Sequence, residues 1–425
     1  FAHVYINGVC SRSFQLNDSG SGVGAIYEDF SHDGKIYINC DSLMENIGSC
    51  RIKDILIYRR ALSKDEILKN TLAYELDMSV QKINYNFEFN NSTLSKMKMY
   101  GSTEGMSLYQ ANTMRLKYES ANTEKYGQSF DLPYCLVQWQ GTSSIGYSIK
   151  NYQATLRDTD MKEYLYTPYP NGIPESIFCF KADYMESSHG RNAGIAKFLN
   201  DCVFTIKNPA QLKDSRVRNA INGFPMLMYI NDELIGIYNF NTDRYSAKTY
   251  GYEDEEKTLV YEIAANSDST AGAFFKYTGS GDPTAYYKAD FMCLYPPTRA
   301  AGNDNFTEIK SLVEWVHDAS DEEFKENFEK HFNKKYVLRY LIYVNLMGAV
   351  DSLGKNMKLA SWDGGNIWYI QPYDCDTTMG LDNSGDLRFG SDIEIGEADT
   401  FNTTASKLWE KVMRVFEEDI KAEYA

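Results

Sequence analysis

The sequence predicts an α+β protein with a β-rich front half and an α-rich back half. Two apolar runs, 225–230 and 234–240, flank the turn Asn231-Asp232-Glu233 and predict a β-hairpin. A loop-rich middle follows. Helical spacing is strongest over 321–350, with at least one break, and its apolar positions are Phe324, Phe328, Phe332, Val337, Leu341 and Leu346. The length of 425 residues indicates two or three domains.

Residues 1–75 are predicted to be β structure that ends in a short helix. Ser63 and Glu66 form a capping box that starts this helix. The motif Tyr-x-Arg-Ala-Leu-Ser-x-x-Glu-Ile, which begins at Tyr58, resembles the C-terminal part of a concanavalin/laminin-G-like jelly roll. The resemblance implies either a module that binds glycans or proteins, or a spacer. The sequence then leaves 76–425 as a second domain.

Composition excludes several classes of function. The formal net charge is -16 and there is no basic stripe, so we expect no nucleic-acid partner. No apolar run approaches the length of about 20 residues that a membrane-spanning helix needs. The eight Cys are dilute and lack Cys-x-x-Cys spacing, which predicts mostly free, buried thiols from a reducing cytoplasm rather than a zinc site. The chain opens on Phe1 inside a strand-like run, so we expect a piece of a longer polypeptide, with no signal peptide visible in it.

Three further segments between the two ends are informative. A loop of small residues, 141–148, leads to the basic residue Lys150. A strand is expected over 178–184, and a helix over 190–202, with Ile195 and other apolar residues on one face.

Asp351, Asn356 and Asp374 have a spacing that fits phosphotransfer chemistry. Asp351 and Asn356 follow the long helical region, and an expected hairpin of 357–361 and 367–370 separates them from Asp374. An Asp-x-x-x-x-Asn pair, then a hairpin, then Asp is the spacing that protein kinases use. A bare match of this kind is weak, because Asp-rich loops are also common on protein surfaces. The apolar helix and strands beside these carboxylates favour a place near a core instead.

The chemistry explains this spacing. Phosphoryl transfer needs positioning and charge neutralisation more than covalent help. Mg²⁺ prefers oxygen ligands and takes one or two carboxylates together with phosphate oxygens, so a hairpin that returns Asp374 to Asn356 suits it. Asp351 can accept the proton of an acceptor hydroxyl, and Lys355 can offset charge on the transferred group.

Residues from about 85 to 425 resemble the spore-coat protein H (CotH) family of atypical protein kinases. Four motifs occur in the family's order, and they are the Gly-Thr-Ser-Ser loop with Lys150, the hairpin 229–238, Asp351 to Asn356, and Pro372-Tyr373-Asp374-Cys375-Asp376 with Gly380. The resemblance implies a two-lobed, kinase-like domain, with a β-rich lobe at about 85–250 and an α-rich lobe at about 300–425. It also implies ATP- and Mg²⁺-dependent phosphorylation of Ser or Thr in a partner protein.

The resemblance also assigns roles to individual residues. Asp351 is expected to be the catalytic base, with Lys355 beside it. The expected metal ligands are Asn356, Asp374 and Asp376. The expected nucleotide contacts are Lys150, the loop residues Ser143 and Ser144, and Arg191 at the start of the helix near residue 190. An ordinary solvated strand lysine is an equally good interpretation of Lys150 from the sequence alone.

One departure from the family pattern leaves a second interpretation open. Family members tend to place an acidic residue soon after the second strand of the hairpin, and here the run is Asn239-Phe240-Asn241-Thr242-Asp243-Arg244. Either Asp243 substitutes or the position is lost, which would give a degenerate kinase. The fusion to a jelly roll also resembles structural or tail-associated bacteriophage proteins. The alternative is therefore a virion or cell-surface component that uses the kinase-like fold as a scaffold among neighbouring structural proteins and binds glycan through 1–75.

Overall fold

The computed structural model describes residues 2–6, 9–14, 94–141, 143–186, 188–263, 274, 277, 279–280, 283–349, 352–381 and 406–424. The chain divides into two compact units, Phe1–Asn91 and Ser92–Ala425. In the first unit, strands β1 (Ala2–Ile6) and β2 (Val9–Phe14) form an antiparallel pair. The rest of the predicted jelly roll, including its capping box, lies outside the described residues.

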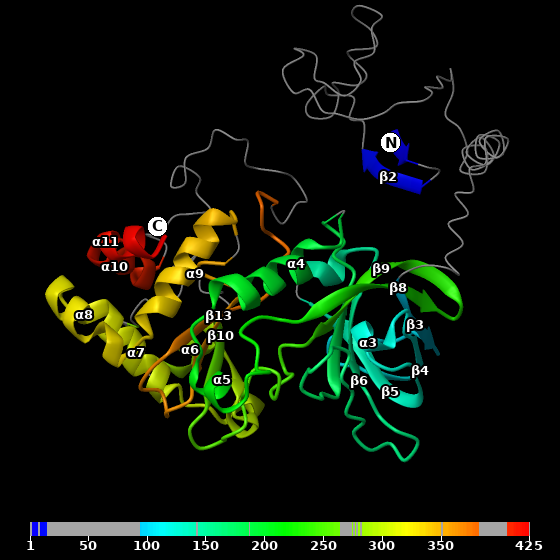
Figure 1. The fold of residues 1–425 in the computed structure, drawn as a ribbon, viewed down its shortest axis with the longest axis horizontal. Helices are drawn as coiled ribbons and strands as arrows, with labels where there is room; N and C mark the ends of the chain where they lie inside the picture. The colour runs from blue at the N-terminus through cyan, green and yellow to red at the C-terminus, as the bar shows by residue number, and fades with distance from the viewer. Residues whose placement is uncertain are drawn as a thin grey trace, which may run out of the picture. The chain divides into compact units, whose positions relative to one another are not determined.

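The front part of the second unit is a closed β-barrel (Figure 1). Its strands, in the order in which they pair, are β3 (Ser95–Tyr100), β4 (Asn112–Glu119), β5 (Phe130–Gln140), β6 (Asn151–Thr155), β7 (Ile177–Lys181), β9 (Glu233–Thr242) and β8 (Gly223–Ile230). All neighbours are antiparallel except β3 and β8, whose parallel pairing closes the barrel. Alternate residues of β3 are buried, which is the period of a strand with one face toward a core. That core is largely aromatic, and Phe178, Phe180 and Phe240 in it are completely buried.

The predicted hairpin is confirmed in the barrel as β8 and β9. Ile230 pairs with Glu233 across the two-residue turn Asn231-Asp232. Both turn residues have positive φ, 50° and 66°, which is the conformation of a type I′ hairpin turn. Asn and Asp tolerate this region better than most residues do, so the sequence of the turn fits its geometry.

The back part of the second unit packs helices against a second sheet. The sheet is antiparallel, in the order β11 (Phe291–Tyr295), β10 (Leu259–Ile263), β12 (Met357–Ser361), β13 (Tyr369–Pro372). The helices are α4 (Arg191–Phe198), α5 (Pro209–Lys213), α6 (Thr284–Asp290), α7 (Thr307–Asp318), α8 (Asp321–Asn327), α9 (Lys334–Leu346), α10 (Lys407–Val415) and α11 (Glu417–Tyr424), with the short α3 (Thr123–Tyr126) in the barrel. Within this unit, Figure 1 shows α7 to α11 on the side away from the barrel. It shows β10, β13 and α4 between these helices and the barrel. The α+β class is therefore confirmed.

The helical predictions are confirmed in two places and incomplete in a third. Residues 190–202 contain α4, which a wider turn continues over Leu199–Val203. The region 321–350 contains α8 and α9, with the expected break at the 3-10 turn Phe328–Lys330. The supposedly loop-rich middle, however, holds β10, β11, α6 and α7. In the described part of the chain, none of the helices is long and apolar enough to cross a membrane.

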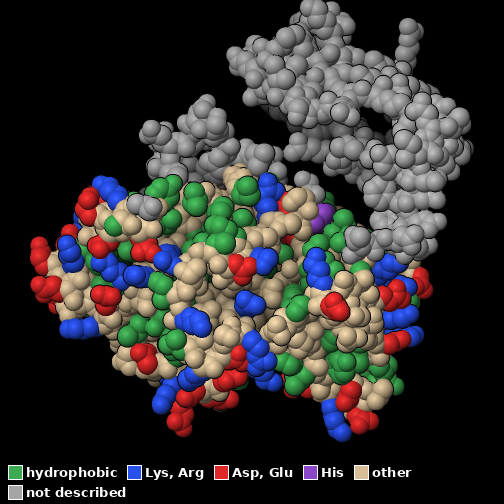
Figure 2. All heavy atoms as spheres, viewed as in Figure 1, with side chains coloured by type: hydrophobic (Ala, Val, Ile, Leu, Met, Phe, Trp, Pro, Cys, Tyr) green, Lys and Arg blue, Asp and Glu red, His purple; other side chains and the backbone are tan. Residues whose placement is uncertain are grey.

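Aromatic packing holds the helices together. Trp315 of α7 stacks on Phe324 of α8 at 5.1 Å between ring centroids, and Phe328 meets Phe416 after α10 at 4.8 Å. Figure 2 shows the surface of the second unit from one side, where acidic and basic side chains are intermixed rather than gathered by sign.

Gly251 packs between Ala210 of α5 and Trp362, which follows β12 of the second sheet, and we expect Gly251→Ala to destabilise the fold strongly. Its φ is 73°, and an added Cβ would lie 2.3 Å from the Cβ of Ala210. Its carbonyl also accepts a hydrogen bond from the indole of Trp362 at 2.8 Å. We expect a loss of about 3 kcal/mol in the free energy of unfolding, because both backbone strain and overpacking contribute.

Urea denaturation measures this loss, and Gly105→Ala is the matched control, measured in the same way. Gly105 also has a φ of 73°, but nothing lies within 4 Å of its added Cβ. We expect it to cost only the backbone term of about 1 kcal/mol. Equal losses in the two variants would show that the close approach to Ala210 contributes nothing.

Candidate functional site

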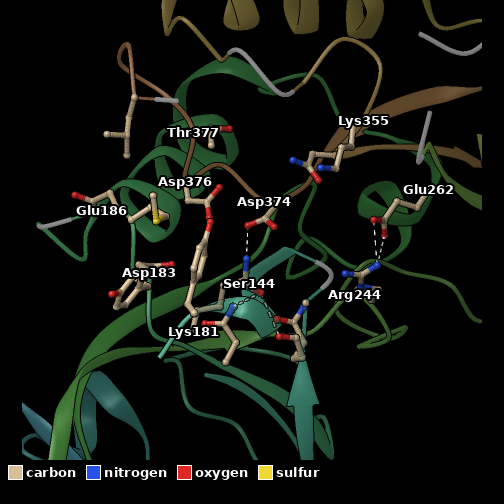
Figure 3. A pocket seen from close by; sticks show the side chains of 18 of the residues that line it. Ser144, Lys181, Asp183, Glu186, Arg244, Glu262, Lys355, Asp374, Asp376 and Thr377 are labelled. Carbon is tan, nitrogen blue, oxygen red and sulfur yellow. Dashed lines mark hydrogen bonds and ion pairs between the residues drawn. The ribbon is translucent and has the colours of Figure 1, made fainter. Parts of the chain in front are cut away.

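A cavity of about 280 Å³ opens between the barrel and the second sheet of this unit. Four segments far apart in the sequence line it, namely the β5–β6 connection, the end of β7 with the loop after it, the β9–β11 region, and the two ends of the β12–β13 hairpin. Its polar lining residues are Gln140, Ser144, Tyr147, Asn151, Lys181, Asp183, Tyr184, Glu186, Arg244, Glu262, Lys355, Asn356, Asp374, Asp376 and Thr377. Figure 3 shows that Lys181 and Asp374 point toward each other, with Asp183 and Glu186 to one side of this pair and Arg244 and Glu262 to the other.

The β12–β13 hairpin brings Asn356 and Asp374 to the same wall of the cavity, as the sequence predicted. Met357 pairs with Pro372, and the backbone N–H of Tyr373 donates to the carbonyl of Asn356 at 2.9 Å. Asn356 and Asp374 both have positive φ, 53° and 51°. Such values are uncommon outside glycine, and they cluster at functional sites where the surrounding structure imposes them.

Lys181, the last residue of β7, forms an ion pair with Asp374. Its amine bonds the Oδ1 atom of Asp374, and the exposed fractions of the two side chains are 7% and 24%. Asn192 of α4 clamps the same segment, since its amide donates to Asp374 Oδ1 at 3.5 Å and accepts from the N–H of Cys375 at 3.0 Å. Burial alone would lower the pKa of Lys181, but the carboxylates of Asp374 and Asp376 raise it well above its usual value, so the amine stays charged.

The β5–β6 connection forms another wall of the cavity. Ser144, in the 3-10 turn Ser143–Gly146, lines the cavity and accepts a hydrogen bond from the amide of Asn151 at 3.3 Å. Gly141 allows this approach, because a Cβ there would lie 1.9 Å from the Ser144 hydroxyl oxygen and its φ is 112°. Ser143 is the first residue of this turn.

Lys150 does not line the cavity. Its amine donates to the carbonyls of Ile145, at 2.7 Å, and Tyr147. The same amine lies over the ring of Trp139, 5.2 Å from its centroid. These contacts fold the β5–β6 connection back on itself, so the structure assigns Lys150 to the support of this loop and brings Lys181 to the cavity instead.

A comparison with known families agrees with this geometry. The family model described as CotH kinase protein matches residues 137–425, which is more than half of the chain. The chain belongs to the CotH kinase family. The match begins inside β5, so it covers most of the barrel and all of the cavity's lining residues. No curated protein matches the chain significantly in sequence.

The predicted catalytic pair is described only in part. Asp351, the expected base of this CotH family member, lies outside the described residues. Lys355, expected beside it, lines the cavity together with Asn356 and Asp376. Lys355 and Asp376 both influence the hydroxyl of Tyr147, whose pKa is raised by burial first and then by the Asp376 charge, while Lys355 opposes this. The hairpin wall therefore faces the β5–β6 connection across the cavity.

The donor set of the hairpin wall fits a divalent cation that is held jointly with a phosphate-bearing ligand. Asp374 and Asp376 supply carboxylate oxygens and Asn356 an amide oxygen, and these are the ligands that Mg²⁺ prefers. Among the described residues, no three His, Cys, Asp or Glu side chains are grouped so as to form a cage by themselves. Mg²⁺ does not need such a cage, since it usually takes one or two carboxylates and completes its shell with phosphates and water.

Arg191 faces Glu186 rather than the cavity. Its guanidinium donates to Glu186 at 2.8 Å, and it is absent from the cavity lining, whereas Glu186 is present. Glu186 also accepts from the N–H groups of Ser188, Gly190 and Arg191, at 2.6, 2.8 and 3.1 Å. The carboxylate thereby caps the N-terminus of α4, where a negative charge is favourable.

Glu186→Gln should flatten the acid limb of the stability profile. Burial would raise the pKa of Glu186, but its hydrogen bonds lower it from 4.5 to about 2. The folded-state pKa is depressed, so this stabilisation is complete above about pH 4.5 and is lost as the pH falls toward 2. Urea denaturation at several pH values between 6 and 3 measures it. The same substitution at exposed Glu104 should leave the profile unchanged, and an equally steep acid limb in Glu186→Gln would contradict the assignment.

Arg244 and Glu262 are lining residues that the sequence analysis missed. Arg244 lies just after β9 and donates from one guanidinium nitrogen to both Glu262 oxygens at 3.1 Å. The neighbouring Asp243, considered as a substitute acidic residue, is completely buried and accepts hydrogen bonds from Gln153 and the Tyr245 backbone. Asp243 therefore supports the strand end, and the residue after it reaches the cavity. No local alternation singles out Arg244, because the last five residues of β9 are all buried.

Proposed function

We propose that this chain is an ATP- and Mg²⁺-dependent protein kinase whose active site is the cavity between barrel and helical part. In this proposal the barrel is the β-rich lobe and the second sheet with its helices is the α-rich lobe of a kinase-like domain. One observation carries the proposal above all others. The ammonium of Lys181 in one part faces the carboxylate of Asp374 in the other across a polar cavity, beside Asn356 and Asp376.

Each wall of the cavity then has a role in binding the nucleotide. Lys181 and the β5–β6 connection with Ser144 contact the phosphates, because an ammonium and a close-packed loop suit a polyanion. Asn356, Asp374 and Asp376 hold the metal ion, which neutralises phosphate charge when it is bound. Lys355, on the same wall, offsets charge on the transferred group.

The acceptor in this proposal is a Ser or Thr hydroxyl of a partner protein. Asp351 precedes the hairpin wall in the sequence, and in the kinase pattern this residue accepts the hydroxyl proton. A partner protein reaches the site through the open side of the cavity. Charged lining residues are assigned to the phosphates and to the metal ion. Among the described lining residues, none is assigned to the acceptor.

Thermal denaturation of the full chain with ATP and Mg²⁺ tests nucleotide binding. A ligand that binds only the folded state adds about 2.7 kcal/mol at 100 times its Kd, which raises Tm by a few degrees. ATP with EDTA should give a smaller shift, since metal and nucleotide share ligands. No shift at millimolar ATP and Mg²⁺ would refute nucleotide binding and favour a non-catalytic structural role for the fold.

A further inference from the structure

Asp183 is a buried carboxylate at the cavity that the proposed reaction does not use. It follows β7 by two residues, is 5% exposed and lines the cavity. Its Oδ2 atom accepts a hydrogen bond from the amide of Asn239, whereas its Oδ1 atom is buried and has no hydrogen-bond partner within the described part of the chain. A buried carboxylate oxygen without a hydrogen-bond partner lowers the stability of the folded state, so a carboxylate at this position calls for a physical explanation.

The backbone fixes Asp183 in place from both sides. The N–H of the preceding Ala182 donates to Asn151 at 2.8 Å, and the Ala182 carbonyl contacts the ring of His189 at 3.0 Å. The amide of Asn239 also donates to the carbonyl of His189 at 2.7 Å. Asp183 itself has a φ of 42°, a conformation that persists only when neighbours impose it. The carboxylate is therefore held at the cavity wall rather than left there by a flexible loop.

The charges around Asp183 connect it to the Lys181–Asp374 pair. Burial raises its pKa to about 6, the charge of Lys181 and the hydrogen bond from Asn239 lower it, and the charge of Asp374 raises it. Lys181 thus has three carboxylates within electrostatic reach, those of Asp183, Asp374 and Asp376, and among them it bonds Asp374. Asp374 and Asp376 are both proposed metal ligands, and a carboxylate engaged with a divalent cation attracts an ammonium less.

We propose that Asp183 is the counter-ion of Lys181 that lies outside the proposed metal ligands, and that it holds the ammonium at the cavity when the carboxylates of Asp374 and Asp376 are engaged elsewhere. Asp183 is a positioning residue in this inference, because it acts on the nucleotide only through Lys181. The inference rests on the proposed function for the event that engages Asp374. The electrostatic exchange itself involves only residues of this chain, so it can be measured without nucleotide or metal.

A double-mutant cycle on the full chain, in metal-free buffer, tests the exchange. The proteins are wild type, Asp374→Asn, Asp183→Asn and the double variant, compared by urea denaturation at one pH. In the wild type, Asp183→Asn removes a charge that Lys181 does not bond. In Asp374→Asn, where the bonded carboxylate is already lost, the same change leaves Lys181 with Asp376 alone of the three carboxylates, so the unfolding equilibrium constant should respond on the order of 10-fold more strongly. Effects that add to within about 2-fold would overturn the inference.

Glu175→Gln provides the matched control cycle with Asp374→Asn. Glu175 is another buried carboxylate with a raised pKa, about 7, caused chiefly by burial, but it does not line the cavity. It accepts from the N–H of Thr249, which a glutamine oxygen can also do. Additive effects in this cycle support the assignment to Asp183, whereas coupling as large as that of Asp183 would show a general response to lost charge and overturn it.

A second background keeps the inference falsifiable if the double variant does not fold. In Lys181→Met, no ammonium offsets the repulsion between the charges of Asp183 and Asp374, so adding Asp183→Asn should relieve repulsion and stabilise the chain. An identical effect of Asp183→Asn in wild type and in Lys181→Met would overturn the inference.

Kinetics separate this inference from the proposed function. If the chain transfers phosphate, Asp183→Asn should raise the KM for ATP roughly 10-fold and should add nothing in the Lys181→Met background, because it acts through that lysine. A further loss in that background would overturn the positioning role. If the wild type binds no nucleotide while the stability cycle shows coupling, the proposed function fails and the counter-ion exchange stands.

Discussion

Asp374→Asn should lower phosphoryl transfer by at least about 10³-fold while the chain stays folded. The substitution keeps the shape of the side chain and an oxygen that can accept from Lys181 and Asn192, the two residues that bond Asp374 Oδ1. It removes one of the two negative charges of the proposed metal ligands, which should weaken binding of the divalent cation, and charge neutralisation by that cation supplies much of the catalysis in a phosphotransfer site. Transfer of labelled phosphate to a Ser-rich peptide, or to the chain itself, measures the loss.

Asp363→Asn is the control for this prediction. Asp363 lies in the turn at the opposite end of the same hairpin, and among the described residues it bonds groups of that turn, such as the Ser361 hydroxyl at 2.7 Å and the Ile367 N–H at 3.0 Å. We expect some loss of stability and little loss of transfer per folded molecule. Transfer that survives in Asp374→Asn at the wild-type rate would show that the metal assignment is wrong.

Local sequence was sufficient to predict the wall that carries Asn356 and Asp374. The strand Met357–Ser361 was expected with the bounds that the structure has, and the Asp-Gly-Gly turn returned the chain to Asp374. Gly364 and Gly365 adopt positive φ values of 80° and 89°, which explains the two glycines. Turn chemistry and an apolar run act over a few residues, so a single sequence reveals them.

Local sequence could not identify the lysine of the cavity. Lys150 follows a loop of small residues, which resembles a phosphate-binding loop, whereas Lys181 lies inside an ordinary strand, so the loop favoured Lys150. The choice depends on barrel register, in which Lys181 pairs with Asn239, a residue far along the chain. The closure of the barrel by β3 and β8 is also non-local and leaves no local pattern. By contrast, α7 was missed although Ile309, Leu312, Val313 and Val316 have helical spacing and are buried.

Lys181→Met should therefore reduce kcat/KM for ATP far more than Lys150→Met does, and this comparison decides which lysine contacts the phosphates. Lys181→Met removes an ammonium that faces the cavity, and we expect kcat/KM for ATP to fall by about 10² to 10³-fold, the range for loss of one preorganised charged contact. The methionine is apolar and of similar length, so packing is largely kept. Asp374 remains partly exposed, which lets water solvate its unpaired carboxylate and limits the loss of stability.

Lys150→Met removes the amine that bonds the carbonyls of Ile145 and Tyr147 and lies over Trp139. We expect a modest loss of stability and a smaller effect on ATP, no more than about 10-fold, through a looser β5–β6 connection rather than a lost phosphate contact. Steady-state kinetics and the ATP-dependent shift in Tm measure both variants in the same way. If Lys150→Met abolished the ATP-dependent shift and Lys181→Met left it intact, the phosphate contact would belong to the loop, and the ion pair with Asp374 would be structural only.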